Sequence, residues 1–311
     1  MSFEFKRKQS VQKAVRRLGA RRIDKSLCAL KHCDRLEAVH SVRKDIKQLR
    51  ALLRLVRDGI PRSDYRRQIE VLRKAASLLA AARDAHVKVN ALAGLTRHFH
   101  QELAPRSFRK IKSALSADCE RRQAGLFNKR VPRKVGQVLN RVSDGFASLE
   151  LNDSGWRALA PGIKSTYRKG RRGYQLARSE GKPDHFHEWR KRVKDLYYQT
   201  GLLHPIWPEQ MAAAEAELKR LGELLGDDHD LVLLTDASGI ARFENTAPEE
   251  TVKLLELVGK RHKQLRAESI KLGARFYREK PKVFCKRLKQ YWKRWRAQSG
   301  SKVSKRSTRT P

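Results

Sequence analysis

Apolar residues recur every three or four positions along most of this chain, the spacing that places them on one face of an α-helix. Prolines stand near the start of many of these periodic segments, where the first helical turn tolerates them best. The pattern predicts an all-α protein with two sets of six helices. The first set covers about 6–33, 36–57, 62–82, 84–98, 105–124 and 132–149. The second set covers about 157–180, 184–203, 208–225, 229–243, 248–278 and 281–297.

The two sets look like two copies of one unit. The residues His, Arg, Lys and Lys at positions 40, 43, 44 and 47 reappear at positions 187, 190, 191 and 194, an offset of 147. Pro61 and Pro208 have the same offset, and so have Arg17 and Lys164. Several markers that share one offset indicate an internal duplication, which predicts two similar antiparallel helical bundles related by a pseudo-twofold. The repeats would cover about 5–150 and 155–298, followed by a disordered basic tail at 299–311.

Composition agrees with a helical protein and adds a large excess of positive charge. Hydrophobic residues make up 40% of the 311 positions, which is enough for a buried core. Lys and Arg number 71 against 33 Asp and Glu, a formal net charge of +38. Such an excess repels itself unless counterions or a polyanionic partner relieve it. By composition alone, nucleic acid is the first candidate for that partner.

The spacing of the cysteines and the lengths of the apolar runs indicate the cellular compartment in which we expect the protein. Cys28, Cys33, Cys119 and Cys285 form no CxxC pair and no disulfide-like spacing. The chain starts without the apolar stretch of a signal peptide, and no apolar run is long enough for a membrane span. We therefore expect a cytoplasmic protein that has no membrane span, no bound metal and no cofactor.

The arrangement of the charge on the helix predicted at 36–57 changes the choice of partner. At about 100° per residue, its basic side chains fall in one sector and its apolar side chains in the opposite one. The basic sector holds no acid, so like charges stand four residues apart and destabilise the free helix. The stripe from position 40 to position 54 extends about 21 Å, which suits a linear polyanion better than a single phosphate. Its residues are His40, Arg43, Lys44, Lys47, Arg50, Arg54 and Arg57.

The helix predicted at 184–203 carries a second stripe, which consists of His187, Arg190, Lys191 and Lys194. Arginine binds phosphate oxygens with a planar fork, and lysine adds a point charge. One basic run is usually only a solvated helix face. Two matched runs, each opened by a histidine, favour a shared binding function. Tyr197 stands where the first stripe has Arg50, so we expect the two halves to bind unequally.

The stripes closely resemble the two signature helices of CHAD domains. The resemblance is carried by HSVRKDIKQLR at 40–50 and HEWRKRVKDLYY at 187–198. The run LGELLGDDHD at 221–230 looks like the family's leucine-glycine…aspartate turn, and AAARD at 80–84 looks like its first-repeat partner, with Ala where Gly is common. The resemblance spans about residues 5–298.

Membership of this family would imply two helical bundles that face each other across a basic cavity. It would also imply non-catalytic binding of inorganic polyphosphate, and an association with granules of that polymer. The stripes would supply most of the ligands, and the first helix of each half would add others. The implied set is His40, Arg43, Lys44, Lys47, Arg50, Arg54, His187, Arg190, Lys191 and Lys194, with Arg17, Arg21, Lys164 and Arg168.

Two alternatives remain open at the level of the sequence. A nucleic-acid-binding protein fits the net charge, although no aromatic platform for bases accompanies the stripes. A metal-dependent enzyme that cleaves phosphoanhydrides would need carboxylates around a metal and a positioned water. The acidic cluster Asp227-Asp228-His229-Asp230 is the candidate for such a site. We expect these acids instead to cap a helix N-terminus or to pair with arginines of the stripes.

Overall fold

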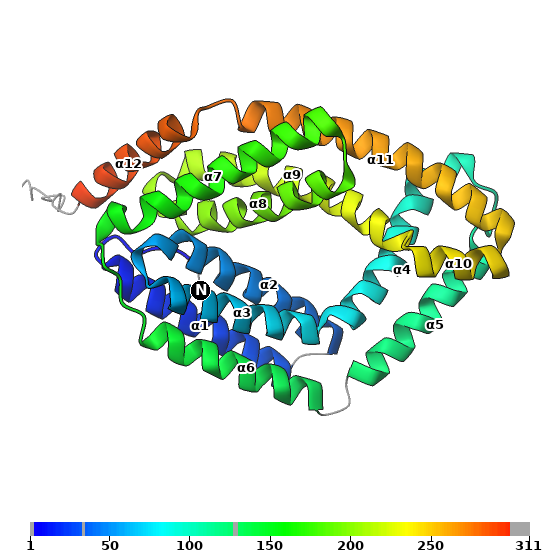
Figure 1. Cartoon of the computed structure of the whole chain (residues 1–311), viewed down its shortest axis with the longest axis horizontal. Coiled ribbons are helices and arrows are strands. Elements are labelled where there is room, and N and C mark those ends of the chain that lie inside the picture. Colours follow the sequence, from blue (N-terminus) through cyan, green and yellow to red (C-terminus); the bar gives the residue numbers. More distant parts are fainter. Residues whose placement is uncertain (1–2, 33–34, 127–129, 299–311) are drawn as a thin grey trace, which may run out of the picture.

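The computed structural model describes residues 3–32, 35–126 and 130–298, and all regular structure in this part of the chain is helical (Figure 1). This confirms the all-α prediction. The helices are α1 (Val11–His32), α2 (Arg35–Leu55), α3 (Arg62–Leu78), α4 (Ala80–His98), α5 (Arg109–Leu126), α6 (Arg130–Ala147), α7 (Gly155–Glu180), α8 (Pro183–Leu202), α9 (Pro208–Leu234), α10 (Ala237–Thr246), α11 (Pro248–Phe276) and α12 (Pro281–Ala297). The predicted tail at 299–311 lies outside the described residues.

The N-terminal segment differs from the prediction, because α1 begins at Val11 and not near residue 6. The residues before it are anchored by tertiary contacts. Phe5 is only 3% exposed and its ring meets Trp292 edge-on, while its backbone N–H donates to the Leu202 carbonyl oxygen at 3.1 Å. Arg17 Nη2 donates to the Glu4 carbonyl oxygen at 3.0 Å. These contacts hold a non-helical segment of bends and a turn where helical periodicity alone predicted another helical turn.

The run at 221–230 is also different, because it forms no turn. It lies inside α9, which continues unbroken from Pro208 to Leu234. Gly222 and Gly226 face α8, where a side chain at either position would meet Lys194 or Arg190. Glycine costs a helix about 1 kcal/mol relative to alanine. Here the two glycines lie against two long basic side chains of α8. Because α9 continues through the acidic cluster, the prediction of a helix N-terminus there was wrong.

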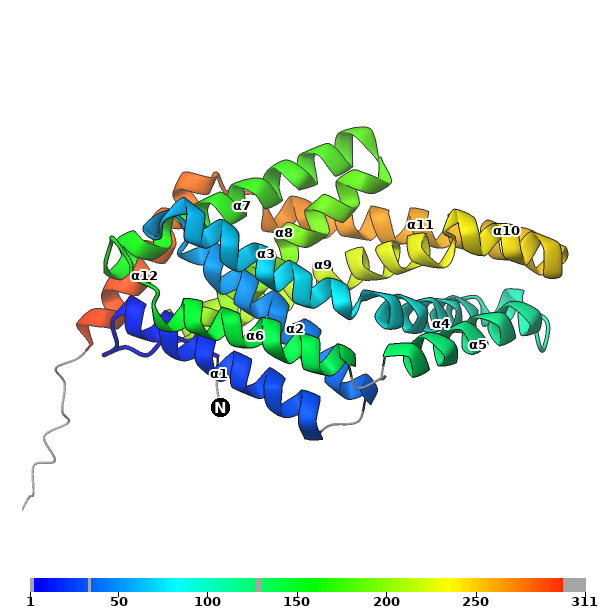
Figure 2. The same cartoon turned by 60° about the horizontal axis from the view of Figure 1, so that its bottom comes forward.

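The buried apolar residues form two clusters. The larger cluster joins α1, α2, α3 and α6 to α7, α8, α12 and the start of α9, with Trp189 and Tyr167 among its largest buried side chains. The smaller cluster joins α4 and α5 to the end of α9, α10 and α11, which project together from one end of the molecule (Figure 2). Both clusters mix residues from the two predicted repeats. The duplication itself stays a prediction.

Close packing of α2 against α7 and α8 brings the two predicted stripes together. Gln199 on α8 donates through Nε2 to the Ala51 carbonyl oxygen on α2 at 3.1 Å, in the buried interface. Gly162 on α7 lies so close to the end of α2 that a Cβ there would overlap the Leu55 carbonyl group. The interface therefore depends on direct contact between backbones.

Two further features concern the environment of the protein. In the described part of the chain, no helix combines the length and the apolar character that crossing a membrane requires. Cys28, Cys119 and Cys285 carry free thiols, and Cys33 lies outside the described residues.

Candidate functional site

A basic cavity of about 250 Å³ lies between α2 and α8, and we call it the inner cavity. Residues at matched positions of the two stripes meet there, Arg43 with Arg190 and Lys47 with Lys194. Eight of the fourteen predicted ligands line it. They are Arg43, Lys47, Arg50, Arg54, His187, Arg190, Lys191 and Lys194.

Four other lining residues were not among the predicted ligands: Arg83 from α4, Asp195 and Tyr198 from α8, and His229 from α9, although Tyr198 was expected on the same face as the second stripe. Arg83 and His229 belong to the two runs that resembled the family's turn, so a signal for them existed. Nothing in the sequence marked Asp195, which looked like a polar position next to the stripe.

Burial and mutual repulsion destabilise the charged forms of the basic side chains that line the inner cavity. Burial, and then the charges of Arg190 and Arg43, lower the pKa of Lys47 to about 7. Burial and then Arg54 lower the pKa of Arg50 to about 10. Burial is also the main cause that lowers the pKa of Arg43, Arg190 and Lys194. A bound anion would stabilise every one of these charged groups.

Two guanidinium groups keep an unused donor inside the protein. The Nε atoms of Arg50 and Arg190 are buried without a hydrogen-bond partner. Such a buried donor costs about 1–3 kcal/mol. By contrast, Arg43 donates through Nη1 to the Ala76 carbonyl oxygen at 3.0 Å, which fixes its direction. The cavity therefore presents fixed, partly unsatisfied donors, which is the arrangement that a phosphate oxygen would complete.

The two histidines of the inner cavity touch each other. His187 Nδ1 lies 3.1 Å from His229 Nδ1, so one neutral ring donates to the other. Burial is the main cause that lowers the pKa of both, and for His229 burial and Arg190 lower it to about 3. Both rings are therefore neutral at pH 7 in the free protein. The pair adds hydrogen-bonding atoms to the cavity without adding to its repulsion.

Asp195 is the single acid among the lining residues of the inner cavity. It is only 7% exposed, and it accepts hydrogen bonds from Arg54 Nη1 at 2.6 Å and from Arg192 Nη1 at 3.1 Å. Burial raises the pKa of this carboxyl group despite the two arginines. Asp195 therefore partly neutralises one end of the cavity.

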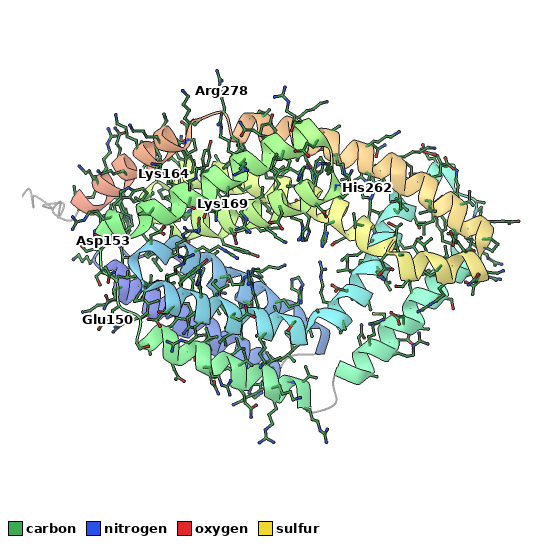
Figure 3. All side chains as sticks on the ribbon, in the orientation of Figure 1. Glu150, Asp153, Lys164, Lys169, His262 and Arg278 are labelled. Atoms are coloured by element: carbon green, nitrogen blue, oxygen red, sulfur yellow. The ribbon has the colours of Figure 1, made fainter. Side chains whose placement is uncertain are left out.

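Six of the predicted ligands do not line the inner cavity. His40 and Lys44 are exposed on α2, and Arg21, Lys164 and Arg168 are exposed on α1 and α7. Arg17 donates to Gln9 Oε1 at 3.0 Å and to the backbone of the N-terminal segment. Lys164 is labelled on α7 in Figure 3.

The acidic cluster of α9 is used for ion pairs. Asp228 accepts from Arg266 Nε at 2.8 Å and contacts His262 Nδ1, labelled in Figure 3, at 2.6 Å. Asp230 accepts from Arg83 Nη2 at 3.3 Å. Among the described residues, no group of three or more His, Cys, Asp or Glu side chains is placed to hold a metal ion. We expected these acids to pair with arginines of the stripes, but the arginines that pair with them, Arg266 and Arg83, belong to neither stripe.

Comparisons with known proteins place the chain among others of similar sequence and fold. A family model described as "CHAD domain" matches residues 10–238. The chain is similar to the crystal structure of the CHAD domain from the plant Ricinus communis, with 14% identity and a TM-score of 0.62 over 88% of this chain and 93% of that chain. It is also similar to PptA from Streptomyces chartreusis, with 15% identity and a TM-score of 0.54 over 88% and 96%. No curated protein matches the chain.

Proposed function

Because the chain belongs to the CHAD domain family, we propose that it binds inorganic polyphosphate in the inner cavity without cleaving it. The observation that carries the proposal is the cluster of partly buried cations from both stripes, two of which keep a buried Nε donor without a partner. A polyphosphate chain would supply one negative charge or more per unit together with several acceptor oxygens. Binding of long chains would also attach the protein to granules of the polymer.

The shape and lining of the inner cavity support polyphosphate over nucleic acid. Single-stranded nucleic acid is usually bound by aromatic side chains on which successive bases stack. Tyr198 is the single Tyr, Phe or Trp among the lining residues of the inner cavity. A space of about 250 Å³ admits a narrow chain of phosphates and leaves little room for bases and sugars.

The carboxylates near the inner cavity support binding over cleavage. Hydrolysis of a phosphoanhydride needs groups that hold a metal or orient the attacking water. Asp195 is engaged by Arg54 and Arg192, and Asp230 by Arg83. We therefore propose a binding protein and expect no phosphate release from polyphosphate in the presence of Mg²⁺ or Mn²⁺.

We expect labelled long-chain polyphosphate to bind below micromolar concentration at physiological salt. Duplex DNA of equal total charge should displace it only at concentrations at least about tenfold higher, because a duplex reaches only the outer surface. A plot of the logarithm of the affinity against that of the salt concentration should slope steeply downward, by about 0.7 for each phosphate contacted. Equal displacement by DNA would instead identify a general polyanion binder.

The affinity should also depend on pH through Lys47. In the free protein, burial next to Arg190 and Arg43 holds its pKa at about 7, so the amine is largely neutral at pH 8. Bound phosphate raises this pKa, so binding takes up a proton and the affinity falls as pH rises above about 7, by at most about tenfold per unit. His187 and His229 have lowered pKa values and add proton uptake only at lower pH.

Calorimetry at pH 8 in buffers of different ionisation enthalpy would measure this proton uptake. The Lys47→Met variant should lose most of it, because the amine that takes up the proton is removed. The Lys44→Met variant is the matched control, since Lys44 is exposed on the same helix. Equal proton uptake by wild type and Lys47→Met would contradict the assignment.

A further inference from the structure

A second basic cavity, of about 700 Å³, lies beside the inner one, and we call it the outer cavity. Its walls come from α3, α7, the end of α2 and the middle of α8. Seven Arg or Lys side chains line it against a single acid, Glu70. Three of these walls each contribute a basic side chain: Arg73 from α3, Lys169 from α7 and Arg192 from α8. Lys169 is labelled in Figure 3.

Two cations of the outer cavity, Arg73 and Lys169, are weakly engaged. Arg73 pairs with Glu70 at 3.4 Å, and both side chains are largely exposed. Exposed pairs of this kind contribute little to stability and exchange readily for a better anion. Among the described residues, no acid lies within ion-pair distance of Lys169, and burial together with Arg57, Arg192 and Arg54 lowers its pKa.

A buried hydroxyl group provides an independent sign of a ligand. Ser165 lines the outer cavity from α7 and is only 8% exposed. Its Oγ atom is buried and has no hydrogen-bond partner. Its neighbour Thr166 instead donates to the Gly162 carbonyl oxygen at 3.0 Å, the usual arrangement for a hydroxyl within a helix. The Ser165 hydroxyl is therefore free to donate to an anion between the basic walls.

The two cavities meet at one ionic bridge. Arg54 lines both, Asp195 lines the inner cavity and Arg192 lines the outer cavity. The Asp195 carboxylate binds both arginines, at 2.6 Å and 3.1 Å. Arg73 of the outer cavity is also near enough to Arg50 of the inner cavity to contribute to its lowered pKa. The two arginines and this carboxylate lie at the boundary between the cavities, and all three are groups that a phosphate chain can engage or displace.

We propose that one polyphosphate chain occupies both cavities, passing from the inner cavity over Arg54 into the outer cavity, where Ser165, Lys169 and Arg192 bind further phosphates. This inference rests on the proposed function and adds a chain-length selectivity to it. Chains too short to leave the inner cavity lose the contacts of the outer one. Longer chains gain those contacts without a second cost of association, so their affinity rises steeply with length.

The test compares long-chain polyphosphate with tripolyphosphate, on the wild type and on an outer-cavity variant, Arg66→Ala/Arg73→Ala/Lys169→Ala. All three side chains are exposed, so the fold should tolerate their loss. The matched control is Arg133→Ala/Lys134→Ala/Arg141→Ala, which removes the same charges from the exposed face of α6. We expect the outer-cavity variant to lose about tenfold or more in affinity for the long chain relative to the control, and to bind tripolyphosphate within about twofold of wild type.

The conservative substitution Ser165→Ala tests the buried hydroxyl without changing the charge. It should weaken long-chain binding by about threefold to tenfold and leave tripolyphosphate binding unchanged. If the outer-cavity variant and the α6 control lose equal affinity, or if wild type does not distinguish the two ligands, the continuous path is wrong while polyphosphate binding stands. Failure of wild type to bind either ligand would overturn the proposed function itself.

Discussion

Replacing Arg43 and Arg190 together by alanine is expected to weaken the binding of long-chain polyphosphate by about a hundredfold or more at physiological salt. These two arginines occupy matched positions of the two stripes and lie opposite each other in the inner cavity. Both are mostly buried, and Arg190 has a buried Nε donor without a partner. A charged hydrogen bond made inside a cavity is screened far less by water and salt than one made on the surface.

The matched control is a double substitution of Lys44 and Arg168 by alanine. Both residues were among the ligands predicted from the sequence, and both are exposed outside the inner cavity. The control removes the same net charge, so it should lose less than about threefold in affinity. Equal losses in the two double variants would show that net charge, and not the inner cavity, governs binding.

Circular dichroism and thermal unfolding should accompany these titrations. The free protein holds Arg43 and Arg190 close together in a partly dehydrated space, which destabilises the fold. Removing both charges offsets the loss of the Arg43 hydrogen bond to the Ala76 carbonyl oxygen. We therefore expect the variant to be as stable as wild type within about 1 kcal/mol, so that a loss of affinity reports on the site.

Replacing Gly162 by alanine should lower the free energy of unfolding by about 3 kcal/mol. The added Cβ would overlap the backbone carbonyl groups of Arg54 and Leu55, which belong to the end of α2. Backbone atoms cannot rotate away as a side chain can, so α7 and α2 would have to separate. That movement would also loosen the buried interface beneath the two stripes and displace Arg54 from Asp195.

Urea denaturation of Gly162→Ala and Gly259→Ala would test this contact. Gly259 lies inside α11, and a Cβ there would meet no atom within 4 Å. Its replacement should raise the free energy of unfolding by about 0.5–1 kcal/mol, because alanine is the better helix former. A neutral or stabilising effect at Gly162 would mean that α2 and α7 do not approach so closely.

Most helices, and the apolar face of α2, could be predicted from the sequence, whereas the start of α1 and the continuity of α9 could not. On α2, Val42, Ile46 and Leu49 were expected opposite the basic stripe, and all three are almost fully buried. Helix formation and amphipathic faces depend on residues a few positions apart, so a local pattern contains the information. The stripes themselves were found in the same way.

Only part of the lining of the inner cavity could be predicted. A helical wheel shows on which side of its own helix a residue lies, but it does not show which other helix packs against that side. Arg43, Lys47, Arg50 and Arg54 fall within about 60° on that wheel and all face α8. Lys44 lies at the edge of the predicted basic sector, and α2 leaves it exposed to solvent.

The sequence by itself determined an all-helical chain with two matched, acid-free basic stripes, because those features follow from residues within one or two turns of each other. Tertiary structure decided the rest. It kept α9 continuous through Gly222 and Gly226, where the sequence predicted a break, and it packed these glycines against Lys194 and Arg190 of α8. It also placed Asp195 against Arg54, a contact between residues 141 positions apart that no local pattern encodes. Which cations become buried, and so bind an anion strongly, depends on packing between distant helices.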